Sequence, residues 1–193
     1  QKYQEPVIRR DSKTDDFVNW SSVAFCPLGH YLAIGTSQGE LVIFNQNMEI
    51  FSYCNKLYKS SIHSMAWSTN GEYIALAAEE DPTIWIYNIK NKVYLAFQTN
   101  LGNEATITAL CWGHDNKILS AGTSNNQVIL YDILTGISVY NILEDFESLR
   151  ADTSIASIDW IAKSNDQIYM LITYRFKKAI VVSLTDFLKK KLE

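Results

Sequence analysis

ITALCWGHDNKILSAGTSNNQVILYD, residues 107–132, is the stretch of sequence that decides the fold. It holds three short apolar runs, and the two turns between them are rich in Gly, Asn, Asp and Ser. In the last run, VILY at 128–131, apolar residues point to both faces of an extended chain. A strand that is apolar on both faces lies between two layers of structure. The stretch therefore predicts a short antiparallel sheet that is covered on both sides.

The same pattern occurs at four places along the chain, at 21–45, 62–88, 107–132 and 155–183. An aromatic residue near the end of each first apolar run recurs after 42, 45 and 48 residues: Phe25, Trp67, Trp112 and Trp160. The first three copies carry a second aromatic 19, 20 and 19 residues later: Phe44, Tyr87 and Tyr131. Repetition at about 40–45 residues, with about four strands in each unit, is typical of the blades of a β-propeller.

The second copy shows how the strands of one unit are placed. We expect its strands near 62–67, 73–78, 83–87 and 92–98, with the turn 69–72 joining the first two. That turn contains Asn-Gly, which is the strongest short hairpin signal. Strict alternation in the first strand predicts two faces, one with Ile62, Ser64 and Ala66 and the other with His63, Met65 and Trp67.

These repeats resemble those of the WD40 family over about residues 20–184. Tyr131-Asp132 is similar to the Trp-Asp pair of that family, and Phe44-Asn45 and Tyr87-Asn88 are weaker substitutes. The resemblance implies an all-β, WD40-like β-propeller with about four blades in this chain, as part of a larger or composite ring. It also implies a turn carboxylate, for which Asp81 is the match in the second blade. Because Gly29-His30 and Gly113-His114 follow their first strands, we expect apolar packing to replace the family's His–Asp bracing.

The repeats also predict the domain organisation. We expect blades at about 20–56, 57–103, 104–152 and 153–184, and a short tail or helix at 185–193. The fourth copy ends after its third strand, near Ser183. The segment 1–19, with Val7-Ile8 at its apolar centre, is the candidate for a shared closing strand.

Composition argues against several classes of protein. The net charge is −4 and Lys and Arg are scattered, which disfavours nucleic acid as a direct ligand. No apolar run is long enough to span a bilayer. Cys26, Cys54 and Cys111 are too widely spaced for a zinc site or a disulfide framework. We therefore expect an intracellular protein, cytoplasmic or nuclear, with no metal, no cofactor, no membrane partner and no small-molecule substrate.

Motifs for catalysis are missing from the sequence. It contains no nucleophile elbow, no phosphate-binding loop and no His-Glu-x-x-His. Its three histidines lie in separate repeats: His30 and His114 in turns, His63 within a strand. The sequence thus favours a protein that is not an enzyme.

Candidate partner-binding residues fall in two places. One is the turn after the second strand of each unit, where the predicted residues line one rim of the ring: Gln38, Glu79, Glu80, Asp81, Asn125 and Asn126. The acidic run among them is either a patch for a basic peptide or a solvated turn. The other place is the connection 143–152, where Phe146 and Leu149 either dock a partner or belong to an ordinary outer strand and loop.

The leading functional prediction is a non-catalytic scaffold for protein–protein interaction within a multi-protein intracellular complex. This prediction rests on family analogy, because a fold by itself does not set function. The alternative is a reader of peptides, degrons or histone tails that acts as a substrate adaptor. An enzyme or a nucleic-acid-binding subunit fits the sequence less well.

Overall fold

The computed structural model describes residues 19–55, 57–99, 101, 105–142, 153–162, 167–175 and 179–186. They form four antiparallel sheets in which consecutive strands are neighbours. Blade 1 holds β1 (Trp20–Phe25), β2 (Tyr31–Thr36), β3 (Leu41–Asn45) and β4 (Ile50–Cys54). Blade 2 holds β5 (Ile62–Trp67), β6 (Tyr73–Ala78), β7 (Thr83–Asn88) and β8 (Val93–Gln98). Blade 3 holds β9 (Ile107–Trp112), β10 (Ile118–Thr123), β11 (Val128–Asp132) and β12 (Ser138–Asn141). Blade 4 holds β13 (Ile155–Ala162), β14 (Ile168–Tyr174) and β15 (Ala179–Ser183).

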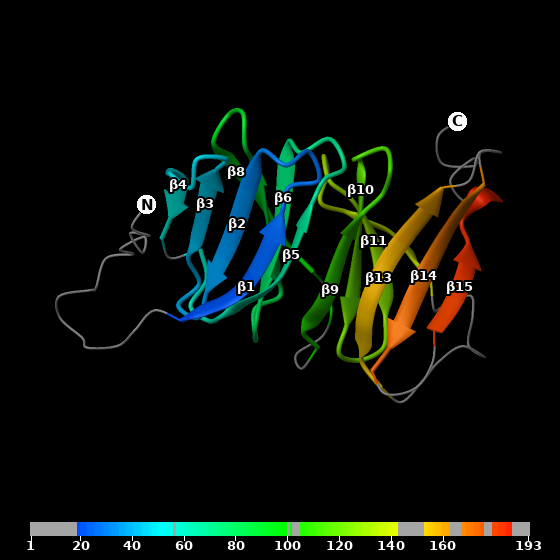
Figure 1. Cartoon of the computed structure of the whole chain (residues 1–193). Helices are drawn as coiled ribbons and strands as arrows, with labels where there is room; N and C mark the ends of the chain where they lie inside the picture. Colours follow the sequence, from blue (N-terminus) through cyan, green and yellow to red (C-terminus); the bar gives the residue numbers. More distant parts are fainter. Residues whose placement is uncertain are drawn as a thin grey trace.

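The sheets follow one another side by side, from blade 1 at the left of Figure 1 to blade 4 at the right. The first strands of successive blades are in contact, β1 with β5, β5 with β9, and β9 with β13. Each inner blade is therefore covered on both faces, which is why its strands are apolar on both faces. The prediction of an all-β, WD40-like propeller with about four blades is confirmed.

Strand positions in the second blade agree with the sequence prediction to within one residue. The loop after β5 contains the predicted Asn-Gly, and Gly71 has a φ of 69°. Both Gly-His pairs lie in turns that follow a first strand, as expected, and His63 lies within β5.

The predicted faces of β5 are wrong at its first two residues. Ile62 pairs with Ala78 and Ser64 with Ala77, so His63 is an extra residue in the ladder, a β-bulge. A bulge reverses the alternation locally. Ile62 therefore packs toward blade 1, against Gly35, whereas the His63 side chain reaches blade 3.

The core lies between the blades rather than inside one of them. One cluster joins blades 1 and 2 through side chains such as Ile43 and Trp67. Similar clusters fill the spaces between blades 2 and 3 and between blades 3 and 4. Asp81, the expected turn carboxylate, accepts the backbone N–H of Thr83 at 2.8 Å, a bond within its own turn.

Two predicted segments fall outside the described residues. The candidate closing strand around Val7-Ile8 is one, and the tail is described only at Thr185 and Asp186. Within the described residues, no helix has the length and apolar character that crossing a membrane requires. Cys26, Cys54 and Cys111 are free thiols.

Candidate functional site

Tryptophan side chains join each blade to the one before it. The Trp67 indole N–H donates to the Ala24 carbonyl at 3.0 Å, and its ring stacks on Tyr31 with 6.2 Å between ring centroids. Trp112 repeats this arrangement one blade later. Its N–H donates to the Ala66 carbonyl at 2.8 Å, and its ring stacks on Tyr73.

The contact between blades 3 and 4 follows the same plan with a different acceptor. The Trp160 indole N–H donates to the Ser120 hydroxyl at 2.5 Å. In all three contacts the last aromatic residue of a first strand thus gives an N–H bond to the preceding blade. Buried indole N–H groups usually find such a partner.

Each first strand has a bulge, and in blades 1 to 3 the bulged residue bonds to the next blade. The bulged residues are Ser21, His63, Thr108 and Ala156. Ser21 donates to the Ile62 carbonyl at 2.6 Å, and Thr108 donates to the Ile155 carbonyl at 2.7 Å. The His63 Nε2 contacts the Ile107 carbonyl in the same way, so this nitrogen carries the proton. In blade 4 the bulged residue is alanine, which has no side-chain donor.

Close packing beside these bonds requires small residues in the second strands. A Cβ on Gly122 would lie 2.5 Å from the Ile155 Cγ2 atom. A Cβ on Gly35 would lie 2.8 Å from Ile62 in the equivalent contact. The blades therefore meet at fixed positions that the repeat brings together.

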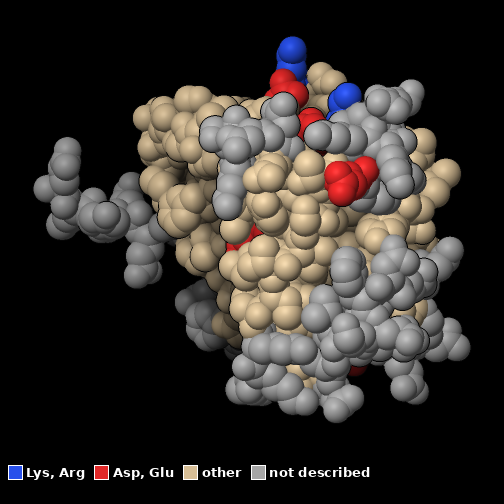
Figure 2. Space-filling view, turned by 90° about the vertical axis from the view of Figure 1, so that its right-hand side faces the viewer, with Lys and Arg blue, Asp and Glu red and all other residues tan. Residues whose placement is uncertain are grey.

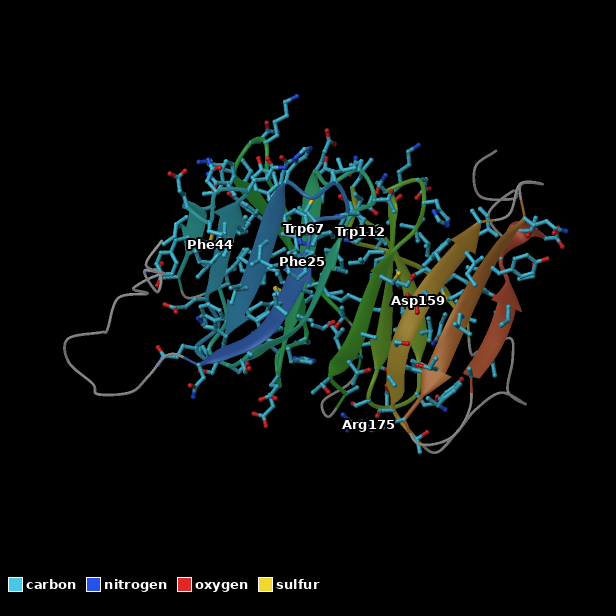
Figure 3. All side chains as sticks on the ribbon, viewed as in Figure 1. Phe25, Phe44, Trp67, Trp112, Asp159 and Arg175 are labelled. Atoms are coloured by element: carbon cyan, nitrogen blue, oxygen red, sulfur yellow. The ribbon has the colours of Figure 1, made fainter. Side chains whose placement is uncertain are left out.

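On the outer face of blade 1, the aromatic residue near the end of the first strand is not covered by another blade. Phe25 stands at the place of Trp67 and Trp112, yet it is 75% exposed where they are 8% and 3% exposed. Trp20 and Val23 are exposed as well. Figure 3 labels Phe25 on β1. We call this surface the N-flank, with Trp20, Val23 and Phe25 as its residues.

The outer face of blade 4 is open in the opposite direction. Val181 is 63% exposed, although the residues at its position in the other blades, Ile43, Ile86 and Leu130, are buried. Ile161 is also exposed, and Asp159 lies beside Leu171 and Val181 in the same row of the sheet. Figure 2 shows this face, and its described part is mostly free of charged side chains. We call it the C-flank, with Asp159, Ile161, Leu171 and Val181 as its residues.

The turns in which the sequence predicts a binding rim lie at one end of the blades. At the start of each turn, a backbone N–H donates to the carbonyl of a residue just before a first strand. The donors occupy equivalent positions in the four blades: Ser37, Glu79, Ser124 and Arg175. Gln38, Glu79, Glu80 and Asn125 are exposed there, whereas Asp81 and Asn126 are half-buried.

Arg175 and the flank residues were missed by the sequence reasoning. Arg175 is exposed at the rim of blade 4, where Figure 3 places it at the lower end of the sheet. Alignment with Ser37 and Ser124 was the signal that would have found it. The other two predicted residues, Phe146 and Leu149, lie outside the described residues.

Metal-binding clusters and cysteine thiols are two features of the described residues that bear on chemistry. They contain no group of three His, Cys, Asp or Glu side chains that is placed to hold a metal ion. Burial raises the pKa of the Cys111 thiol to about 11, and burial also raises the pKa of Cys54. Both are neutral thiols near pH 7, and the thiolate is the reactive form.

Sequence comparisons connect the chain to one family. The family model described as the anaphase-promoting complex subunit 4 WD40 domain matches residues 23–100 and 74–163. Echinoderm microtubule-associated protein-like 4 of Xenopus tropicalis is 22% identical over 128 residues, which is 65% of this chain and 14% of that protein. Protein FIZZY-RELATED 3 of Arabidopsis thaliana is 23% identical over 138 residues, 68% of this chain and 27% of that protein.

Structure comparisons give the same fold. A chain of the Mitotic Checkpoint Complex superimposes with a TM-score of 0.66 at 13% identity, covering 88% of this chain and 54% of that one. Saccharomyces cerevisiae Sqt1 superimposes with a TM-score of 0.68 at 16% identity, covering 86% and 45%. The chain thus spans about half the length of these solved structures and a smaller share of the two curated relatives.

Proposed function

Because the chain belongs to the family of the anaphase-promoting complex subunit 4 WD40 domain, we propose that it is a non-catalytic scaffold for protein–protein interaction. In this proposal it works inside a multi-subunit intracellular assembly. Its blades form one arc of a larger or composite ring, and the two flanks at the ends of the arc hold other protein structure.

The exposure of the two flanks is the observation that carries the proposal. The equivalents of Phe25 in blades 2 and 3 and the equivalents of Val181 in blades 1 to 3 are buried, yet Phe25 and Val181 are exposed. Contiguous exposed apolar patches on soluble proteins mark interaction sites. Protein surface is the natural cover for both flanks.

Other features support a scaffold over a reader of short peptides. The rim residues Gln38, Glu79 and Asn125 are exposed on separate turns of separate blades. One oxygen of the Asp81 carboxylate accepts a bond within its own turn. One of the similar solved structures is described as a complex, the Mitotic Checkpoint Complex, which fits the same role.

Affinity purification of the tagged chain from cells tests the proposal with two matched pairs of substitutions. Phe25→Glu with Val181→Glu places a charge on each flank, at side chains that are exposed. Glu79→Gln with Glu80→Gln removes two charges from the rim without changing side-chain size. The mass of the purified complexes is then measured by light scattering, and their subunits are identified by mass spectrometry.

The flank pair is expected to lose the associated proteins, because a charge buried against apolar surface costs several kcal/mol when it is unpaired. The protein that carries Glu79→Gln and Glu80→Gln, the rim pair, is expected to keep the associated proteins. The opposite result, with partners lost only in the rim pair, would establish the peptide reader instead. Retention of all partners by both pairs would refute a scaffold that binds through its flanks.

A further inference from the structure

Successive blades also meet through their fourth strands, on the outside of the arc, and these contacts differ in chemistry. In the contact between blades 1 and 2, the Ser52 hydroxyl on β4 lies 2.8 Å from the Tyr87 hydroxyl on β7. The Lys92 ammonium, from the turn before β8, lies over the Phe51 ring, 4.6 Å from its centroid. Polar side chains therefore occupy the outer edge of this contact.

The equivalent contact between blades 2 and 3 is apolar. Residue pairing in the outer ladders places Leu95 at the position of Ser52. Gly136 takes the position of Lys92 in the turn before the fourth strand, and both residues have a positive φ. A Cβ on Gly136 would lie 2.7 Å from the Phe97 Cβ, so the turn between β11 and β12 packs directly against β8. Neither polar side chain of the first contact has a counterpart in the second.

Apolar side chains are exposed around the packed turn. Leu134 and Ile137, on either side of Gly136, are exposed. Leu95 is exposed as well, and it lies two residues from Phe97 on the same face of β8. We call this surface the outer patch, with Leu95, Leu134 and Ile137 as its residues. Contiguous exposed apolar patches mark interaction sites.

A buried hydroxyl without a partner adjoins the outer patch. The Tyr131 ring packs on Phe97 with 5.2 Å between ring centroids, and Tyr131 is 2% exposed. Tyr87, at the equivalent position, bonds to Ser52, whereas the Tyr131 hydroxyl has no hydrogen-bond partner among the described residues. Burial raises the pKa of Tyr131 to about 12, so the hydroxyl keeps its proton near pH 7. Since buried Tyr hydroxyls usually find a partner, a bound molecule that supplies an acceptor would complete this site.

The charges beside the outer patch favour a carboxylate as that acceptor. The sequence of β8 contains no charged residue. The Lys117 carbonyl accepts the Ile133 N–H at 3.0 Å, which places a lysine next to the turn. The Asp132 carboxylate already accepts the N–H groups of Leu134 and Thr135 within the turn. A hydroxyl also forms a stronger bond with an ionised acceptor than with a neutral one.

We propose that the outer patch binds a linear segment of another protein, with apolar side chains on the patch and an Asp or Glu carboxylate that accepts a hydrogen bond from Tyr131. Exposed side chains beside a strand suit a peptide, whereas small molecules are bound in concave pockets. The outer patch is separate from both flanks, so this inference goes beyond the proposed function. The contact between blades 1 and 2 offers no such site, because Ser52 is already bonded to the Tyr87 hydroxyl.

Selection from a phage-displayed library tests this proposal, because random peptides assume nothing about the sequence that is bound. Short random peptides are selected on the native chain after depletion on a Leu134→Glu protein. We expect the enriched peptides to combine Leu, Ile or Phe with Asp or Glu. An enriched peptide is then labelled with fluorescein, and its Kd is measured by fluorescence polarisation.

Three substitutions in the patch are expected to weaken binding of the labelled peptide. Leu134→Glu sets a like charge against the carboxylate and should raise the Kd at least about tenfold. Tyr131→Phe removes only the hydroxyl and should raise the Kd about threefold to tenfold. Leu95→Ser gives the Tyr131 hydroxyl a partner within the chain, as Ser52 does for Tyr87, and should raise the Kd about tenfold.

Controls separate binding from folding. Met48→Glu changes an exposed side chain in the turn before β4 and should keep the Kd within about twofold of the native value. Leu134 is exposed and the Tyr131 hydroxyl has no partner among the described residues. The thermal unfolding midpoints of Leu134→Glu and Tyr131→Phe should therefore remain that of the native protein.

The other outcomes overturn the inference. Enrichment of basic peptides or of no peptide does so, and so does an unchanged Kd for Tyr131→Phe. The segment 143–152 of the chain also combines apolar and acidic residues; tighter peptide binding after Phe146→Ala with Leu149→Ala would show that this segment, and not another protein, occupies the patch. The scaffold proposal is tested apart from these results, because Phe25→Glu with Val181→Glu changes only the flanks and should leave the Kd of the peptide unchanged.

Discussion

Replacing Thr108 with valine removes one bond between blades and almost nothing else. The Thr108 hydroxyl sits on the bulge of β9 and donates to the Ile155 carbonyl in the first strand of blade 4, at 2.7 Å. Valine has nearly the same shape but no hydroxyl. The Ile155 carbonyl then loses a donor in a contact where Ile155 is 1% exposed.

The expected loss follows from the burial of that carbonyl. A typical intramolecular hydrogen bond contributes about 0.5–1.5 kcal/mol net, and a buried group left without a partner costs about 1–3 kcal/mol. For this half-buried bond we expect the free energy of unfolding to fall by about 1–2 kcal/mol. A domain of this size then loses about 2–8 °C in its unfolding midpoint.

Urea unfolding followed by tryptophan fluorescence measures the effect, because Trp112 and Trp160 lie in the blades that Thr108 connects. Thr108→Ser keeps the hydroxyl, so it should cost less than about 1 kcal/mol, for the lost methyl group. Ala156→Thr places a hydroxyl on the exposed bulge of blade 4 and should change stability by less than about 0.5 kcal/mol. Equal stability of Thr108→Val and the native protein, or equal losses for valine and serine, would refute the reasoning.

Three further predictions concern packing, exposure and ionisation. Gly122→Ala should destabilise the protein by about 1–3 kcal/mol in chemical denaturation, because its new Cβ would collide with Ile155; native stability in this variant would contradict the close approach of blades 3 and 4. Trp112→Ala should cost about 3–5 kcal/mol, whereas Phe25→Ala, at the equivalent exposed position, should cost less than about 1 kcal/mol; similar losses in the same denaturation assay would argue against an open N-flank. Burial raises the pKa of Cys111 from 9.0 to about 11, so the native state binds the proton more tightly than the unfolded state. The stability that this difference contributes is complete below pH 9 and is lost as pH rises through about 11; a Cys111→Ala variant should show a shallower decline over that window, and an unchanged slope would show that the thiol is not responsible.

Much of the fold could be predicted from the sequence because repetition multiplies a weak local signal. The phase of Phe25, Trp67, Trp112 and Trp160 located the first strand of every blade, and the Asn-Gly at 70–71 located a hairpin. Apolar residues on both faces indicated that each sheet lies between neighbours. The rim positions also followed from the sequence, because turn residues such as Gln38 and Asn125 occupy the same place in aligned repeats.

The tertiary structure alone decided which face of each strand meets which neighbour. A bulge adds one residue to a ladder without leaving a sequence signal, and it turned His63 from its predicted face toward the Ile107 carbonyl. Exposure was equally hidden, since Val181 and Leu130 are both apolar strand residues and differ only in whether a blade covers them. The sequence by itself determined the repeat, the strands and the turns, because these depend on residues close together in the chain. The inter-blade bonds, the open flanks and the position of Asp159 depend on contacts between segments about 45 residues apart, and only the folded arrangement of the blades specifies them.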